Sequence, residues 1–185
     1  MKKLILASAS LRRKELLERA GFRFEIVPSH IDETFDKQLN YYENVMKTAL
    51  KKGEDIFQHH PDDVVLSADT IVVYQGEVFG KPRDRDDAKR MLQTLSGKEH
   101  QVITGVAILS GEGIDNFYIE SLVRFNELTE EEIDDYISTG EPMDKAGAYA
   151  IQGIGKKLVS GYTGSFTNIV GLPIEDIENK LKKQL

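Results

Sequence analysis

The sequence contains no cysteine, and no apolar run in it approaches the length of a membrane span. The first absence excludes disulfide bonds and thiolate catalysis, and it favours a reducing compartment. The second excludes a membrane-spanning helix, and the apolar residues before Ser8 are too few for a signal peptide. We therefore expect a cytoplasmic protein without a membrane partner.

Positive charge is also scarce. The chain carries 24 lysines and arginines against 31 aspartates and glutamates, which gives a formal net charge of −7 at pH 7. This balance disfavours broad electrostatic binding of nucleic acid. If the protein binds phosphate groups, we expect it to bind them in a local basic pocket.

Strand and helix patterns alternate along the chain. With 185 residues, 40% of them hydrophobic, we expect one domain over residues 1–185 that consists of two small lobes sharing a sheet. The periodicity predicts an α/β fold with at least one antiparallel pair of strands. The expected strands are 4–7, 22–27, two short apolar runs at 64–66 and 71–73, 100–110 and 117–125. The expected helices are 12–20, 41–60, 83–95, 129–139, which opens with a capping box, and a last one with Pro173 as its first residue.

The strongest local signal lies where the first strand meets the first helix. The apolar run Leu4–Ala7 leads into Ser8-Ala9-Ser10-Leu11-Arg12-Arg13. A helix start offers free backbone N–H groups, and Arg12 and Arg13 add forked cationic donors, so this turn can hold phosphates. The alternative is a simple serine cap followed by solvated arginines. Arginines at a helix N-terminus oppose the helix dipole, which favours the anion site.

Asp69 is the strongest single candidate for chemistry. It interrupts an otherwise apolar stretch, where an unpaired carboxylate is costly to desolvate. We expect it at a strand end in one of two roles. Either Asp69 and Thr70 form a turn or cap, or Asp69 is a base or metal ligand at the carboxyl end of a strand, where α/β proteins carry their sites.

Two further charged segments can contribute to such a site. Asp32 and Glu33 lie in an acidic loop, and an acid from this loop could share a Mg²⁺ or Mn²⁺ ion with Asp69, because these ions prefer carboxylate oxygens. The alternative is a solvated acidic loop. Lys81 is constrained between a glycine and a proline, and its alternative is an ordinary turn lysine; Lys52 gives a weaker signal.

Glycine-rich segments near the C-terminal end do not match known nucleotide motifs. Neither the spacing of a phosphate-binding P-loop nor a dinucleotide fingerprint is present. Residues 161–168 fit a nucleobase-facing loop or a plain hairpin connection, and the hairpin is the default. Gln152 offers both a donor and an acceptor, so it can read the edge of a base.

Seven short motifs, taken together and in order, resemble the Maf family, which is named for septum formation. They are Ser8–Leu17, Ser67–Thr70, Gly80–Pro82, Leu95–Gly97, Glu141–Tyr149, Ile151–Gly153 and Val170–Pro173. The resemblance implies an elongated, mixed and twisted sheet flanked by helices, with two lobes and a central cleft, similar to that of the inosine triphosphate pyrophosphatases. It also implies a homodimer.

The implied activity is that of a nucleoside triphosphate pyrophosphatase with a divalent cation, Mg²⁺ or Mn²⁺. The motifs match most closely the branch that acts on dTTP and UTP, which implies removal of damaged or modified nucleotides from the pool. Asp69 would be the catalytic proton acceptor, and Asp69 and Glu33 would hold the metal. The residues implied to bind substrate are Ser8, Arg12, Arg13, Lys52, Thr70, Lys81 and Gln152, of which Arg12, Thr70 and Gln152 are tied to substrate choice.

The chain departs from the family pattern at two positions. Leu11 stands where the family usually has proline, which makes the first turn less rigid. Gly53 stands where the branch more often has alanine, so we expect a looser helix around Lys52. An ordinary aspartate is a weak base at neutral pH, so we also expect the metal to contribute most of the activation of the attacking water.

Two other functions use the same anion site. One is a nucleotide-binding regulator of septum formation without catalysis, which would bind nucleotide but release no diphosphate. The other is a different phosphohydrolase, such as a phosphomonoesterase, which would release single phosphate groups.

Overall fold

The structure is a computed structural model that describes residues 2–185, so Met1, the first residue of the predicted domain, lies outside the described residues. The chain forms two compact units. Unit 1 consists of the residues up to 70 together with 104–119 and 171–185. Unit 2 consists of residues 71–103 and 120–170. The prediction of one domain with two lobes stays a prediction.

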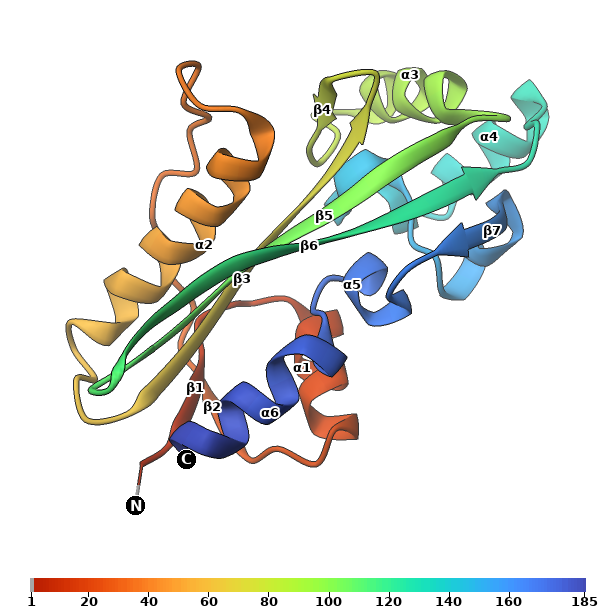
Figure 1. Ribbon diagram of the computed structural model, residues 1–185. Coiled ribbons are helices and arrows are strands. Elements are labelled where there is room, and N and C mark those ends of the chain that lie inside the picture. Colours follow the sequence, from red (N-terminus) through yellow and green to blue (C-terminus); the bar gives the residue numbers. More distant parts are fainter. Residues whose placement is uncertain (1) are drawn as a thin grey trace. The chain divides into compact units, whose positions relative to one another are not determined.

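Within the described residues the strands form a seven-stranded sheet in the order β2-β1-β3-β5-β6-β7, with β4 beside β3 (Figure 1). Strand β1 pairs in parallel with β2 and β3, whereas β4 and β7 pair antiparallel with β3 and β6. The sheet is therefore mixed, as predicted. The strands are β1 (Leu4–Leu6), β2 (Phe24–Ile26), β3 (Val64–Tyr74), β4 (Glu77–Phe79), β5 (Glu99–Ser110), β6 (Gly113–Phe125) and β7 (Val159–Thr163).

The helices follow the predicted starts closely. Helix α4 begins with the expected capping box between Thr129 and Glu132. Pro173 caps the last helix instead of being its first residue, so that detail of the prediction is wrong. The helices are α1 (Leu11–Arg19), α2 (Tyr41–Phe57), α3 (Arg85–Leu95), α4 (Glu130–Ser138), α5 (Phe166–Val170) and α6 (Ile174–Gln184), with short 3₁₀ segments η1 (Glu141–Asp144), η2 (Ala146–Ala148) and η3 (Gly153–Leu158).

Two elements near the C-terminal end were not predicted. Residues 159–163 form β7, which continues the sheet beside β6, and residues 166–170 form the single-turn helix α5. The default prediction of a plain hairpin connection over 161–168 is therefore wrong. Strand β7 is half-exposed and rich in glycine and hydroxyl residues, so its apolar periodicity is weak.

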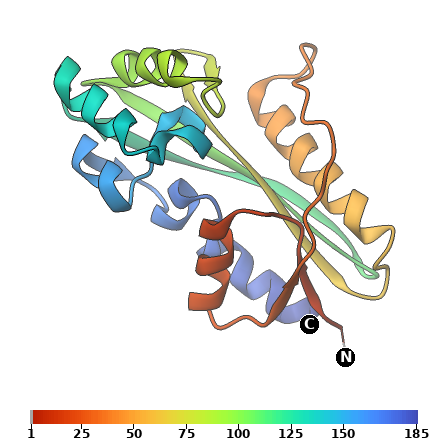
Figure 2. The ribbon, with the colours of Figure 1, turned by 180° about the vertical axis from the view of Figure 1, so that it is seen from behind.

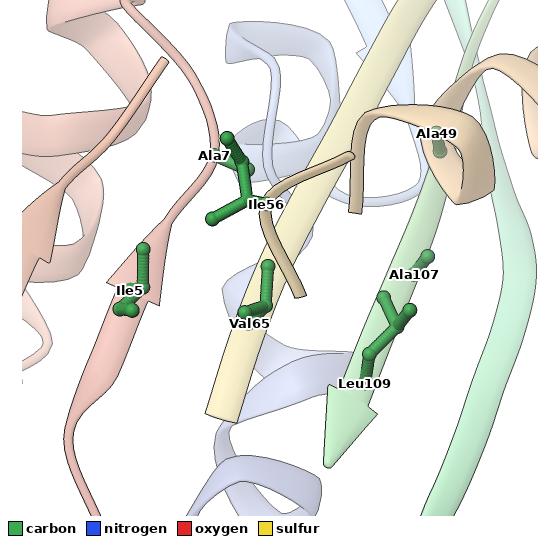
Figure 3. Close-up of a cluster of buried hydrophobic side chains, with 7 residues drawn as sticks. All are labelled: Ile5, Ala7, Ala49, Ile56, Val65, Ala107 and Leu109. Atoms are coloured by element: carbon green, nitrogen blue, oxygen red, sulfur yellow. The ribbon is translucent and has the colours of Figure 1, made fainter. Parts of the chain in front are cut away.

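Helix α2 packs against β1, β3 and β5 in unit 1. Figure 3 draws the side chains at this contact: Ala49 and Ile56 from α2, with Ile5, Ala7, Val65, Ala107 and Leu109 beneath them. The blue C-terminal helix α6 lies on the other side of these strands. Two glycines allow the close approach of α2 to β5. A methyl group at Gly53 would lie 2.3 Å from the Leu109 side chain, and one at Gly105 would lie 2.3 Å from the Val45 carbonyl oxygen.

Unit 2 has its own core around α3, α4 and the second half of β6. A buried aromatic group contributes to it: His100, Phe125 and Tyr149 pack edge to face, with ring centroids 4.7 to 5.4 Å apart. Within residues 2–185, no helix combines the length and the apolar character that crossing a membrane requires.

Candidate active site

The turn after β1 is built as a helix cap. The Ser10 side chain accepts a hydrogen bond from the Arg13 backbone N–H at 3.4 Å, and the Ser8 hydroxyl accepts one from the Ser10 N–H at 3.2 Å. The serines therefore do cap α1, as the simpler alternative stated. The cap brings both arginines into the first turn of α1 and leaves the earliest N–H groups of the helix without intrahelical acceptors.

Asp69 lies in the middle of β3, because Val64–Tyr74 forms one continuous strand. Both predicted roles assumed a strand end, and that assumption is wrong. The strand end next to Asp69 belongs to β1, which pairs with β3 only as far as Leu6 opposite Leu66. Asp69 therefore lies beyond the carboxyl end of β1, which is the usual edge for sites in α/β proteins.

Asp69 and Thr70 point to opposite faces of β3, because side chains alternate along a strand. On the α2 face, Asp69 Oδ1 accepts a hydrogen bond from Lys52 Nζ at 3.1 Å. On the other face, Thr70 Oγ1 accepts a hydrogen bond from Arg13 Nη2 of α1 at 3.1 Å. Consecutive residues of one strand thus hold a lysine from one helix and an arginine from another.

The loop between β2 and α2 brings Glu33 to the same lysine. Lys52 Nζ lies 2.9 Å from Glu33 Oε1, and its side chain is only 12% exposed. The loop runs alongside α2 in the opposite direction, as the orange connection in Figure 2 shows, and Ser29 bonds Asp55 while Asp36 pairs with Lys47. Lys52 therefore holds two carboxylates from two different segments.

Arg13 is anchored at three of its nitrogens. Nε donates to the Gly171 carbonyl at 2.8 Å, Nη1 to Ser8 Oγ at 3.2 Å, and Nη2 to Thr70. Burial lowers the pKa of the Arg13 guanidinium, and the negative charge of Asp69 acts in the opposite direction. A guanidinium remains protonated in either case, so a fixed positive charge lies close to Asp69.

Arg12 differs from its neighbour. It is half-buried, and its side chain makes no hydrogen bond or ion pair with any of residues 2–185. Its positive charge helps to lower the pKa of the neighbouring Arg13 guanidinium. Two adjacent cations at a helix start, neither of them in an ion pair with a carboxylate within residues 2–185, form an arrangement that an anion stabilises.

Sequence reasoning missed two groups of this site. Thr104 on β5 is fully buried, and its hydroxyl lies 2.9 Å from Thr70 Oγ1. The signal that could have found it is a hydroxyl residue within the apolar run of β5. The Gly171 carbonyl, which accepts from Arg13, left no trace in side-chain patterns.

The remaining predicted residues, Lys81 and Gln152, belong to unit 2. Lys81 is exposed and Gln152 is half-buried, and neither side chain makes a hydrogen bond or ion pair within residues 2–185. The backbone around Gln152 is nevertheless fixed. Glu141 accepts from the Gly155 N–H at 2.8 Å, and the buried Tyr136 hydroxyl accepts from the Ala150 N–H at 3.1 Å.

The donor set of unit 1 fits a hard divalent cation. Within residues 2–185 no cluster of three or more metal-ligating histidine, aspartate or glutamate side chains occurs, so Asp69 and Glu33 are the two acids available around Lys52. Mg²⁺ is commonly held by one or two carboxylates, with water and substrate phosphates completing its shell. Asp32 makes no ion pair with Lys52 within residues 2–185, and its Oδ1 accepts two hydrogen bonds from Thr34.

Comparison with known proteins identifies the family. The family model described as Maf-like protein matches residues 3–184. The chain belongs to the Maf-like protein family. A dTTP/UTP pyrophosphatase of Bacillus cereus (strain G9842) is 50% identical over 183 residues, which cover 99% of this chain and 96% of that relative. A dTTP/UTP pyrophosphatase of Geobacillus sp. (strain WCH70) is 49% identical, with 99% of this chain and 98% of the relative covered.

The fold of this Maf-like protein also has a solved counterpart. The Ham1 protein of Staphylococcus aureus matches it with a TM-score of 0.57 and 11% identity, and each chain is covered completely. At this identity the match concerns the fold alone, and it supports the predicted fold class. The resemblance to the Maf family is thus confirmed, whereas the roles of the individual site residues stay predictions.

Proposed function

We propose that this Maf-like protein is a nucleoside triphosphate pyrophosphatase that hydrolyses dTTP and UTP to the monophosphate and diphosphate. The observation that carries the proposal is the cluster in unit 1: Lys52 bridges Asp69 and Glu33, and Arg13 bonds Thr70, the residue after Asp69. The choice of dTTP and UTP rests on the relatives, which carry these substrates in their names and share about half of this sequence.

The cations of the cluster suit a polyphosphate. Phosphoryl transfer requires charge neutralisation and in-line positioning more than covalent chemistry. Arg12 has no anionic partner, and Arg13 has a fixed orientation, so both can bind phosphate oxygens without first breaking an ion pair. The Lys52 ammonium, which already pairs with Asp69 and Glu33, can also bind a phosphate oxygen that comes close to these two carboxylates. We also propose Lys81 as a phosphate ligand and Gln152 as the residue that reads the base.

Asp69 is the proposed acceptor for a proton of the attacking water. The water oxygen forms a bond to the α or β phosphorus. The bond from that phosphorus to the oxygen that bridges the α and β phosphorus breaks, and the electron pair of this bond leaves on the bridging oxygen. One product is the nucleoside monophosphate and the other is diphosphate. The hydrogen bond from Lys52 fixes Asp69 Oδ1, which leaves the other carboxylate oxygen to orient the water.

A divalent cation is part of this proposal. Asp69 and Glu33 would hold it, and when bound it would polarise the water and neutralise phosphate charge. Lys52 Nζ lies within hydrogen-bonding distance of both carboxylates. Its positive charge offsets their mutual repulsion. Mg²⁺ and Mn²⁺ both suit oxygen donors.

The test is a product assay. The purified chain is incubated with Mg²⁺ or Mn²⁺ and, separately, with each common ribo- and deoxyribonucleoside triphosphate, and the products are resolved by ion exchange. The proposal expects monophosphate and diphosphate in equal amounts, fastest from dTTP and UTP. Release of single phosphate groups would assign a phosphomonoesterase-like activity instead. Nucleotide-dependent stabilisation without any product would assign a non-catalytic regulator.

Septum formation, removal of unwanted nucleotides, a cytoplasmic site of action and a homodimer remain predictions of the family resemblance. A sedimentation measurement on the purified chain, with and without nucleotide, tests the dimer directly.

A further inference from the structure

A buried hydroxyl on β5 extends the arginine network of unit 1. Thr104 is fully buried, and its side-chain oxygen lies 2.9 Å from Thr70 Oγ1, where either hydroxyl can donate. Ile103 before it and Val106 two residues after it on the strand are fully buried apolar residues. Burying a hydroxyl in such surroundings is costly unless it is hydrogen-bonded. The bond to Thr70 meets this requirement and ties β5 to β3 at the residue after Asp69.

Thr70 passes this constraint on to Arg13. Its Oγ1 accepts from Arg13 Nη2 at 3.1 Å, and it also lies 3.5 Å from the Gly171 carbonyl, which accepts from Arg13 Nε. With Ser8 bound to Nη1, three segments hold the guanidinium in one plane and one position. Without the Thr104 hydroxyl, Thr70 could rotate away from Nη2, because one of its two hydrogen-bonded side-chain neighbours would be missing.

The network leaves a defined part of Arg13 available. A guanidinium has five N–H donors. The described bonds occupy Nε and one N–H on each terminal nitrogen, which leaves one N–H on Nη1 and one on Nη2. The N–H groups that lie side by side on the two terminal nitrogens of a guanidinium match two oxygens of a phosphate.

We propose that Thr104 is a positioning residue for phosphate binding, which acts through Thr70 to hold Arg13 with its two remaining N–H groups presented to a polyphosphate. The inference rests on the proposed function for the identity of the substrate. It concerns affinity for the phosphate chain, and it leaves the proton transfer at Asp69 unaffected. Its consequence can therefore be measured with inorganic triphosphate, which has no base and no sugar.

The test compares Thr104→Val, which removes the hydroxyl at nearly constant shape, with Thr104→Ser, which keeps it. Thr48→Val is the matched control, because Thr48 lies half-buried on α2 and makes no hydrogen bond through its hydroxyl within residues 2–185. Calorimetry gives the affinity for inorganic triphosphate, and steady-state kinetics give KM and kcat for dTTP. We expect Thr104→Val to weaken triphosphate binding and to raise KM about tenfold, with kcat within about twofold of wild type. Thr104→Ser and Thr48→Val should bind like wild type.

A cycle with Arg13→Lys separates positioning from a general loss of packing. Lysine keeps the charge but lacks the fork, so Thr104→Val should weaken triphosphate binding no further in the Arg13→Lys background. If Thr104→Val weakens triphosphate binding equally in the wild-type and Arg13→Lys backgrounds, the inference is overturned. Wild-type affinity for triphosphate in a folded Thr104→Val protein would overturn it as well. If Thr104→Val does not fold, failure of Thr104→Ser to retain wild-type affinity overturns it. A wild type that binds triphosphate through this network but releases no diphosphate overturns the proposed function alone.

Discussion

The two units hold their candidate residues in different ways. In unit 1 the side chains fix one another: Lys52 bonds Asp69 and Glu33, and Arg13 bonds Thr70. In unit 2, Lys81 and Gln152 make no side-chain bond within residues 2–185, although the backbone around Gln152 is fixed by Glu141 and Tyr136. Charges that must act on a reacting phosphate need a fixed position. An amide that reads a base needs free donor and acceptor groups on a rigid support.

The most severe test of this comparison is Asp69→Asn. If unit 1 carries out the chemistry, the loss of the proton acceptor should lower kcat for dTTP about a thousandfold, with nucleotide affinity within a few fold of wild type. Diphosphate release and calorimetric binding measure the two effects. Asp62→Asn is the control, because Asp62 is an exposed aspartate of the same unit. Near-normal turnover in Asp69→Asn would remove Asp69 from the mechanism.

Unit 2 also contains a buried histidine, His100, that is not among the candidate site residues and makes stability depend on pH. His100 is 2% exposed, and its Nε2 lies 2.7 Å from the Tyr149 hydroxyl. Burial lowers the pKa of His100 to about 4, whereas an unfolded chain has a histidine pKa of about 6.5. The unfolded chain therefore takes up the proton first as the pH falls, and stability is lost between about pH 6.5 and pH 4.

For this single group the loss from pH 7.5 to pH 5 should be about 2 kcal/mol of unfolding free energy. Urea unfolding at both pH values measures it in wild type, in His100→Phe and in His59→Gln, which changes an exposed histidine. His100→Phe should have the weaker pH dependence, and His59→Gln should match wild type. An unchanged dependence in His100→Phe would contradict the assignment of the effect to His100.

Gly53 tests how tightly unit 1 supports Lys52. The expectation of a looser helix stays a prediction, and a methyl group at Gly53 would lie 2.3 Å from Leu109 Cδ1 and 2.8 Å from Ser67 Oγ. Gly53→Ala gains helix propensity but overlaps the sheet, so we expect a net loss of about 1 to 2 kcal/mol in unfolding free energy. Chemical denaturation measures it. A more stable Gly53→Ala protein would show that α2 can shift away from β5 at low cost.

The smallest expected effect concerns the first turn of α1. Leu11 is 71% exposed, and Ser10 before it is extended with ψ 117, a conformation that a following proline allows. Proline suits the first helical position because its missing N–H has no helical acceptor there. Leu11→Pro should raise the unfolding free energy by about 0.5 to 1 kcal/mol, as measured by thermal unfolding. A destabilised Leu11→Pro protein would mean that the turn needs the Leu11 N–H or backbone freedom.

Local patterns predicted much of the fold. The capping box at Thr129 and the helix starts are confirmed, because each depends on residues close together in the sequence. The mixed sheet is confirmed as well. Strand β7 was missed, because its stability comes from pairing with β6 rather than from its own composition. The sequence predicts Asp69 at a strand end, because an unpaired carboxylate is costly to bury within an apolar strand. Lys52, from a helix earlier in the chain, offsets that charge inside the strand.

The candidate site was predicted in its charged members and in the hydroxyl residues Ser8 and Thr70, but not in Thr104 or the Gly171 carbonyl. Charges and small hydroxyls mark Arg12, Arg13 and Asp69 in the sequence, whereas Glu33 and Lys52 give weaker signals whose roles the family resemblance implies. Thr104 could not be ranked above other threonines, since its importance depends on a contact between β5 and β3 that no local pattern encodes. Backbone acceptors such as the Gly171 carbonyl have no side-chain signature at all.

In the proposed function, Asp69 serves the phosphate chemistry common to all substrates, whereas Gln152 serves the choice of base. The most direct measurement is the ratio of kcat/KM for dTTP to that for CTP in Asp69→Asn and in Gln152→Ala. We expect Asp69→Asn to leave this ratio unchanged while it strongly reduces kcat/KM for both nucleotides. Gln152→Ala should make the ratio about tenfold smaller. A changed ratio in Asp69→Asn, or an unchanged one in Gln152→Ala, would contradict this assignment of roles.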